Sequence, residues 1–200
     1  EALYQQSPFP KSGQKYKREW FKVIPKLPDD VRIVHLVRLW DKANSTTGDY
    51  TVGVLMAYCS DGYFYILDVV RGKWTSYERD QRMIRTAKDD NEKYGKVQIR
   101  HQQDPGSAGK DSAEATNRLL MGFSAKFETV TGDKATRSEP LESAFQGGMV
   151  YLLQGLWNEA FIEECVAFDR GKYDDQVDAG SGAYSELLKM IGVHRKSRIL

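Results

Sequence analysis

The segment Val31–Asp41 constrains the fold most, because it is a long apolar stretch that ends in a carboxylate. It is dominated by valine, isoleucine, leucine and tryptophan, and it contains neither glycine nor proline. This composition predicts a largely buried strand in the middle of a sheet. A carboxylate at the end of such a strand is costly unless a partner or a metal ion compensates its charge. Asp41 is therefore the first candidate for a functional residue, although an aspartate that caps the following turn is the plainer interpretation.

The composition limits the class of protein. With 200 residues, of which 40% are hydrophobic, the chain can form one domain with a proper core. Its 29 basic and 28 acidic residues give a net charge of +1, so any surface that binds nucleic acid must be local. No apolar run is long enough to predict a membrane span. Cys59 and Cys165 have no metal-binding or redox spacing and are expected to be reduced, buried thiols.

The order of the expected elements predicts an α/β fold. Strands Tyr50–Cys59 and Tyr63–Arg71 follow the first strand through tight links, and Asp61-Gly62 is typical of a hairpin turn. Three such strands form an antiparallel meander. Helices are then expected at Ser76–Tyr94, Ser112–Phe123, Glu139–Gly147, Trp157–Ala167 and Asp174–Ile191, and strands at Val97–Gln103, Lys126–Val130 and Met149–Leu153. We therefore predict a mixed central sheet, a three-strand antiparallel meander plus parallel strands, with helices on both faces.

Three parts of the chain differ in character. Residues 1–28 are rich in Gln, Ser, Pro and Lys and are interpreted as an extended arm that docks through its aromatic side chains. Residues 29–192 are expected to form the folded domain, and residues 193–200 a short basic tail. The chain begins with Glu1 rather than methionine, from which we expect a fragment of a longer protein.

A second acidic position, Asp104, follows the strand expected at Val97–Gln103. The glycine-rich turn after it superficially resembles a phosphate-binding loop. A Walker A loop needs four residues between its glycines and Ser or Thr after the lysine. Here two residues separate Gly106 from Gly109, and Asp111 follows Lys110. We therefore exclude an ATP site of this kind in the chain.

A third acidic group, Asp174, Asp175 and Asp178, opens the last expected helix. Acidic residues in a first turn suit the helix dipole, and capping explains one or two of them. Three within five residues repel each other and favour a bound cation. Asp175 and Asp178 are three residues apart and Asp174 and Asp178 are four apart, so either pair shares a helix face.

The three acidic positions form one site only if the fold brings them together. The result would be an oxygen-rich site suited to hard cations such as Mg²⁺ or Mn²⁺. Two ions roughly 3.5–4 Å apart would clamp an in-line phosphoryl displacement. One ion would activate water, and the other would stabilise the leaving 3′-oxygen.

Four motifs in this order resemble the C-terminal nuclease domain of the large terminase subunit of tailed phages. They are Trp40-Asp41 with Gly48-Asp49-Tyr50-Thr51, Gln103–Lys110, Thr131-Gly132-Asp133-Lys134 with Arg137, and Asp174–Ala179. The resemblance covers about residues 1–190, and the arm at Tyr4–Pro8 is similar to the linker that leaves the ATPase domain. It implies a ribonuclease H-like fold and a metal-dependent endonuclease. Such an enzyme would cut concatemeric viral DNA at the start and end of packaging.

The resemblance also implies metal ligands. Asp41 and Asp104 would bind metal, and the third ligand lies among the acids of the last helix. Terminases share the pair at Asp174 and Asp175, whereas resolvases carry two acids three residues apart, which favours Asp175 with Asp178. We therefore rank Asp175 and Asp178 above Asp174 as catalytic residues.

Further residues near the acidic positions are candidates for supporting roles. Asp49 would be an outer acid of the metal site. Lys110, Lys134 and Arg137 are expected in loops, where they would hold DNA phosphates or offset the acidic charge. Ordinary solvated loop charge is an equally good interpretation of these three cations.

The implied partners are double-stranded DNA, the ATPase domain of the same full-length chain, the portal and the small terminase subunit. The implied location is the host cytoplasm rather than the mature virion, without a membrane. Two alternatives remain open. One is a Holliday-junction resolvase or transposase-type nuclease on the same fold, and the other is a non-catalytic module that binds DNA or a portal. Cutting of plasmid DNA that depends on divalent ions separates the second alternative from the nucleases.

Overall fold

In the computed structural model, residues 15–43, 46–103, 107–129, 133–168 and 170–197 are described. Seven strands of this part form one sheet in the order β1-β7-β4-β3-β2-β5-β6. The strands are β1 (Lys22–Ile24), β2 (Ile33–Asp41), β3 (Thr51–Cys59), β4 (Phe64–Gly72), β5 (Gln98–Gln103), β6 (Ser124–Thr129) and β7 (Val150–Leu153). The helices are the 3₁₀ helix η1 (Arg18–Trp20), α1 (Ser76–Tyr94), α2 (Ser107–Leu119), α3 (Lys134–Gln146), α4 (Asn158–Val166) and α5 (Asp175–Ser197).

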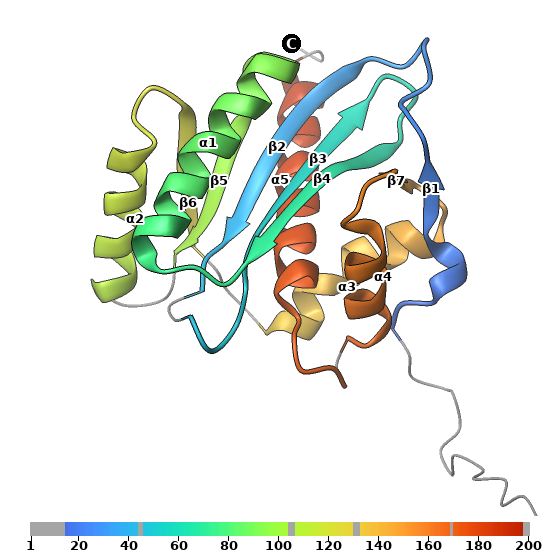
Figure 1. Cartoon of the computed structure of the whole chain (residues 1–200). Coiled ribbons are helices and arrows are strands. Elements are labelled where there is room, and N and C mark those ends of the chain that lie inside the picture. Colours follow the sequence, from blue (N-terminus) through green and yellow to red (C-terminus); the bar gives the residue numbers. More distant parts are fainter. Residues whose placement is uncertain (1–14, 44–45, 104–106, 130–132, 169, 198–200) are drawn as a thin grey trace, which may run out of the picture.

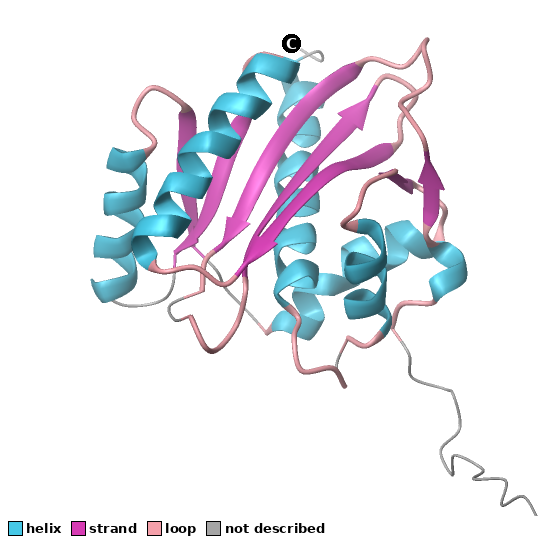
Figure 2. Cartoon of the chain, viewed as in Figure 1, coloured by secondary structure: helices cyan, strands magenta, loops and turns pink. Residues whose placement is uncertain are grey.

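The predicted mixed sheet is confirmed. Strands β2, β3 and β4 form the antiparallel meander, and β5, β6, β7 and β1 add to it through parallel pairings. Gly62 forms the hairpin turn between β3 and β4 with φ at 85°, a conformation that favours glycine. Helices α1 and α5 cross opposite faces of the sheet (Figure 1), and Figure 2 shows the strands enclosed between these helical layers.

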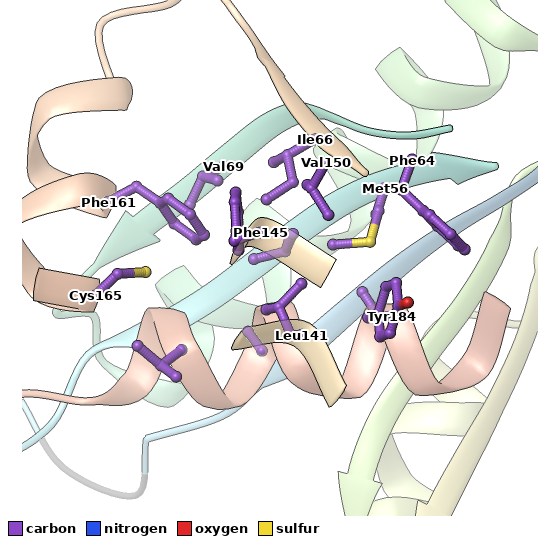
Figure 3. Packing of buried hydrophobic residues seen from close by; sticks show 14 of the residues in the cluster. Met56, Phe64, Ile66, Val69, Leu141, Phe145, Val150, Phe161, Cys165 and Tyr184 are labelled. Carbon is purple, nitrogen blue, oxygen red and sulfur yellow. The ribbon is translucent and has the colours of Figure 1, made fainter. Parts of the chain in front are cut away.

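Side chains alternate along β2 and so build a core on each face of the sheet. Leu39 contributes to the larger core, which contains side chains of α3, α4 and α5. Figure 3 shows part of this core, where Ile66 and Val150 of the sheet lie near Phe145. Trp40, the next residue, lies on the other side and packs with Met83 of α1. Because both faces are covered from Leu36 to Trp40, this part of β2 is buried as its composition predicts, whereas Val34 near its start is exposed.

Described residues of the expected arm take part in the sheet and in the core. β1 pairs in parallel with β7, and Tyr16 is fully buried in the larger core with Phe21 packed against it. This part of the arm therefore packs against the domain through Tyr16 and Phe21, and Lys22–Ile24 belongs to the sheet. Three residues of strand give almost no periodic signal, because the pairing with β7 that stabilises them is non-local.

Several helices have different ends from those expected. α2 begins at Ser107 rather than Ser112, so that Gly109 and Lys110 are helical. α3 begins at Lys134 rather than Glu139, because the side chain of Asp133 accepts a hydrogen bond from the backbone N–H of Thr136 and caps the helix. α3 therefore contains Pro140 within it. Residues 193–197, expected in a basic tail, belong to α5.

Among the described residues, no helix combines the length and the apolar character that crossing a lipid bilayer requires.

Candidate active site

The strands that carry the candidate acids end at one edge of the sheet. β2 and β5 are parallel, with Trp40 opposite His101, and β5 and β6 are parallel, with Gln103 opposite Thr129. Asp41 is the last residue of β2. Asp104, which follows Gln103 in the sequence, lies outside the described residues. The carboxyl ends of neighbouring parallel strands are a common place for a ligand site in α/β sheets.

Helix α5 begins at the same edge. The backbone N–H of Tyr50, just before β3, donates a hydrogen bond of 3.0 Å to Oδ2 of Asp175. β3 starts beside the end of β2, since Asp41 lies opposite Val52. Figure 1 shows the ends of β2 and β5 and the start of α5 at the lower end of the molecule. The fold therefore brings the acidic start of α5 to the end of the strand that carries Asp41.

A close contact between α5 and β2 places Asp178 near the level of Asp41. A Cβ atom added to Gly182 would lie 2.7 Å from Cδ1 of Leu39, so the helix backbone packs directly on this strand. Asp178 lies one helical turn nearer the edge than Gly182, about 6 Å along the axis. Asp41 lies two residues beyond Leu39, about 7 Å along the strand. Asp41 and Asp178 are therefore at similar positions along the direction of the strand.

A cleft lies between α5 and the strands of this sheet edge. It has a volume of about 280 Å³, and Asp178, Ser181 and Gly182 of α5 line it together with Leu39 of β2 and Gln102 of β5. Glu128 and Thr129 of β6 and Arg137 of α3 also contribute. Gln102 is two residues before Asp104, so the part of β5 that leads to Asp104 lies across the same cleft from Asp178.

The three acids of α5 differ in burial. Asp175 and Asp178 are each 4% exposed, whereas the side chain of Asp174 is 38% exposed. Burial raises the pKa of Asp175 to about 6, and the negative charges of Asp49, Glu164 and Asp174 act in the same direction. The hydrogen bond from Tyr50 opposes this effect. Two carboxylates held in so little solvent fit a site that a cation completes.

Lys134 and Arg137 bind two of these acids. Nζ of Lys134 lies 2.7 Å from Oδ1 of Asp174 and 2.9 Å from Oδ2 of Asp178, and Nη2 of Arg137 lies 3.1 Å from Oδ1 of Asp178. Burial alone would lower the pKa of Lys134, but the hydrogen bonds from the two carboxylates outweigh it and raise that pKa. Of the two roles considered for these cations, the structure supports the one in which they offset acidic charge.

The prediction that the three cations lie in loops was wrong. Lys134 and Arg137 lie in the first turns of α3, and Lys110 is an exposed residue of α2. The helix cap at Asp133 orders the start of α3 and so places Lys134 over the acids of α5.

The oxygen-only donor set suits a hard divalent cation. Carboxylates of Asp175 and Asp178 are buried at the sheet edge where Asp41 ends β2. No three His, Cys, Asp or Glu side chains converge on a possible metal position within the described ranges. Asp104, one of the expected metal ligands, lies outside those ranges.

Glu164 is a supporting residue that sequence analysis missed. Its Oε1 accepts a hydrogen bond of 2.6 Å from the backbone N–H of Gln176, and its Oε2 accepts one of 2.7 Å from the Gln176 side chain. Nη2 of Arg71 lies 3.1 Å from the same carboxylate. Glu164 thus binds the first turn of α5 to α4 and β4. No local sequence pattern identifies Glu164, because its partners Arg71 and Gln176 lie far from it in the sequence and only the folded chain brings them into contact.

Comparison with known proteins supports the same architecture. A family model described as a terminase RNaseH-like domain matches residues 38–187. The large terminase nuclease from thermophilic phage G20c, with bound zinc, is 17% identical over 84% of this chain and 95% of that chain, with a TM-score of 0.55. Its magnesium-bound form is 15% identical over 88% and 98% of the chains, with a TM-score of 0.58. No curated protein matched the sequence.

A viral protein from outside the phages is also similar. The human cytomegalovirus terminase nuclease domain, soaked in manganese and with an inhibitor bound, is 14% identical over 76% of this chain and 82% of that chain, with a TM-score of 0.60. At these identities the structures establish the fold alone. The family model covers three quarters of the chain, and it includes β2, β5 and the acidic start of α5. The chain therefore belongs to the terminase RNase H-like domain family.

Proposed function

We propose that this domain is a metal-dependent DNA endonuclease that cuts concatemeric viral DNA during genome packaging. The observation that carries the proposal is the pair of buried carboxylates, Asp175 and Asp178, held at the sheet edge where β2 ends in Asp41. The relatives of the same fold that carry zinc, magnesium or manganese are terminase nucleases, which supports the same activity here.

Asp41, Asp104, Asp175 and Asp178 would hold Mg²⁺ or Mn²⁺, with Asp49 as an outer acid. Two such ions would supply an activated water and would stabilise the leaving 3′-oxygen of the phosphodiester. Asp174 is a weaker candidate because it is the most exposed acid of the three. The greater burial of Asp175 and Asp178 supports their higher rank.

The remaining residues of the site position these carboxylates. The backbone N–H of Tyr50 holds one oxygen of Asp175 and so orients the other. Glu164 holds the first turn of α5 through Gln176. Lys134 and Arg137 offset the charge of Asp178 from the side of α3, which lowers the repulsion between the acids.

The substrate would be double-stranded DNA in the host cytoplasm. The domain would work beside an ATPase domain of the same full-length chain, with the portal and the small terminase subunit as partners in packaging. These partners follow from membership of a terminase family rather than from a contact in this domain.

The test is cleavage of supercoiled plasmid by the purified chain with Mg²⁺ or Mn²⁺, and the same reaction in EDTA. We expect nicked and linear products only with metal, and their loss in Asp178→Asn. Asp89→Asn, which changes an exposed acid of α1, is the matched control and should cleave like wild type. Wild-type protein that binds plasmid but never cuts it with either metal would favour the non-catalytic module. Strong preference for a four-way junction over linear duplex would favour the resolvase.

A further inference from the structure

A cluster of cationic and aromatic side chains lies beside the acidic site. It consists of Tyr50, Arg71, Lys73, Lys172 and Tyr173, called here the Tyr50–Tyr173 patch. The antiparallel pairing of Thr51 with Gly72 brings the residues next to them, Tyr50 and Lys73, together where β3 begins and β4 ends. The segment between α4 and α5 adds Lys172 and Tyr173.

Close ring contacts hold the patch together. The rings of Tyr50 and Tyr173 meet edge to face, with centroids 4.9 Å apart. Cζ of Arg71 lies 3.7 Å from the centroid of Tyr50, and Nζ of Lys73 lies 4.6 Å from Tyr50 and 4.9 Å from Tyr173. Nζ of Lys172 lies 5.2 Å from the ring of Tyr173. Each cation therefore lies against an aromatic ring.

Two of the three cations have no carboxylate partner among the ion pairs of the described residues. Arg71 pairs with the buried Glu164, which makes its charge part of the internal structure. Lys73 instead donates a hydrogen bond of 3.2 Å to the phenol oxygen of Tyr173, and Lys172 lies against the ring of the same tyrosine. Two ammonium groups beside the ring of Tyr173 thus make a local positive surface on a chain whose net charge is +1.

The patch is continuous with the candidate active site. The backbone N–H of Tyr50 donates to Asp175, and Tyr173 is two residues before Asp175 in the chain. A DNA strand with one phosphodiester at the acids would therefore carry its next phosphates past the patch. Acidic residues repel those phosphates, so a cationic surface beside the acids is needed to hold the strand in place.

We propose that the Tyr50–Tyr173 patch binds the phosphate backbone of the DNA strand that flanks the cleaved bond. Lys73 and Lys172 would contact phosphate oxygens, and Tyr173 would hold both ammonium groups in position. The proposal rests on the proposed nuclease function and deepens it by locating a substrate contact away from the acids. It also replaces Lys134 and Arg137, which are paired with Asp178, as the phosphate-binding cations.

The test is the salt dependence of DNA binding in EDTA, where cleavage is prevented. Fluorescence anisotropy of a dye-labelled duplex would be measured for wild type, for Lys73→Gln/Lys172→Gln and for Lys172→Gln alone. Each lost phosphate contact lowers the slope of log K against log salt by about 0.9, so the double variant should lose about 2 and the single variant about 1. Lys93→Gln/Lys96→Gln is the matched control, because it removes the same charge at the opposite edge of the sheet, and it should keep the wild-type slope.

The other outcomes separate this proposal from the nuclease proposal. If wild type cuts plasmid with metal and the lysine variants keep the wild-type salt slope, the proposal for the patch is overturned and the nuclease proposal stands. Failure of wild type both to bind duplex and to cut plasmid would overturn the two together. A thermal melt with and without Mn²⁺ reports whether the acidic site is intact in each variant. A lower melting temperature with an unchanged salt slope would assign the patch a purely structural role, and exposed Lys172 provides a variant that should fold normally.

Discussion

Nζ of Lys134 lies 2.9 Å from Oδ2 of Asp178, a carboxylate whose side chain is 3% exposed. The same ammonium also binds Asp174. It therefore occupies a position from which it neutralises acids that we assign to metal binding. A divalent cation at Asp178 would have to share this carboxylate with Lys134 or displace it.

Lys134→Met should therefore change how the protein responds to metal. Without metal the variant should melt lower, because the buried carboxylate of Asp178 loses one of its two cationic partners; the shift should be about 2–4 °C for each kcal/mol lost in a chain of 200 residues. With Mn²⁺ it should gain more stability than wild type, because no ammonium competes for the carboxylates. Lys110→Met, at an exposed position of α2, is the control. An equal rise in melting temperature on adding Mn²⁺ to wild type and to Lys134→Met would contradict competition between Lys134 and the metal ion for these carboxylates.

Asp41→Asn should abolish cleavage while the fold remains intact, because the amide keeps the shape of aspartate but loses the charge that binds a hard cation. The loss should exceed the roughly 10–100-fold effect of changing an outer residue of a metal site. Removing one of several crowded acids should also relieve repulsion, so the metal-free variant should melt slightly above wild type. Plasmid cleavage and paired melts with and without Mn²⁺ measure these effects. A variant that still cuts DNA, with a full gain from Mn²⁺, would remove Asp41 from the site.

Glu164→Gln should weaken the connection between α4 and the start of α5. The substitution leaves Arg71 without its carboxylate partner and replaces a strong acceptor of the Gln176 hydrogen bonds. A group left unsatisfied in a buried position costs about 1–3 kcal/mol, which denaturant unfolding would measure. Metal affinity should fall with stability, since Asp175 and Asp178 lie in the same helical turns. Glu163→Gln, an exposed neighbour on α4, is the control, and equal stability of the two variants would exclude this positioning role.

His101 should make the protein less stable as the pH falls. It is fully buried, its Nε2 donates a hydrogen bond of 2.9 Å to Oδ1 of Asn117, and burial lowers its pKa from 6.5 to about 4. Between these values the unfolded chain binds the proton and the folded chain does not. Stability is therefore complete above about pH 6.5 and falls toward pH 4, by up to about 3 kcal/mol at 1.36 kcal/mol per pKa unit.

Urea unfolding of wild type and His101→Gln between pH 4 and pH 7 checks this contribution. The variant should have a weaker pH dependence, so the difference in unfolding free energy should shrink as the pH falls. Asp175 acts with the opposite sign, because its pKa is raised and it favours the folded state as the pH falls. Since Asp175 is present in both proteins, the difference between them isolates His101. A constant difference across this range would contradict the assignment.

Local patterns determined most of the architecture. The apolar run of β2, the hairpin glycine at Gly62 and the periodicity of α1 each depend on neighbours in sequence, so their elements could be predicted. The acids of α5 and the strand-end Asp41 were also visible, because acidic residues beside apolar runs are unusual. Residues Thr75 and Glu78 form the capping box that starts α1.

Only the tertiary structure decided what those residues contact. Lys134 and Asp174 are forty positions apart in the chain, yet the cap at Asp133 and the packing of α3 bring them within 2.7 Å. The strand β1 exists only through β7, and the rings of Tyr50 and Tyr173 meet only because α5 packs on β2 and β3. The sequence by itself determined which residues are apolar, acidic or helix-capping. Long-range packing decided which acids are neutralised by lysine and which cations are left to contact a phosphate. The energies of those contacts arise only once the chain has folded.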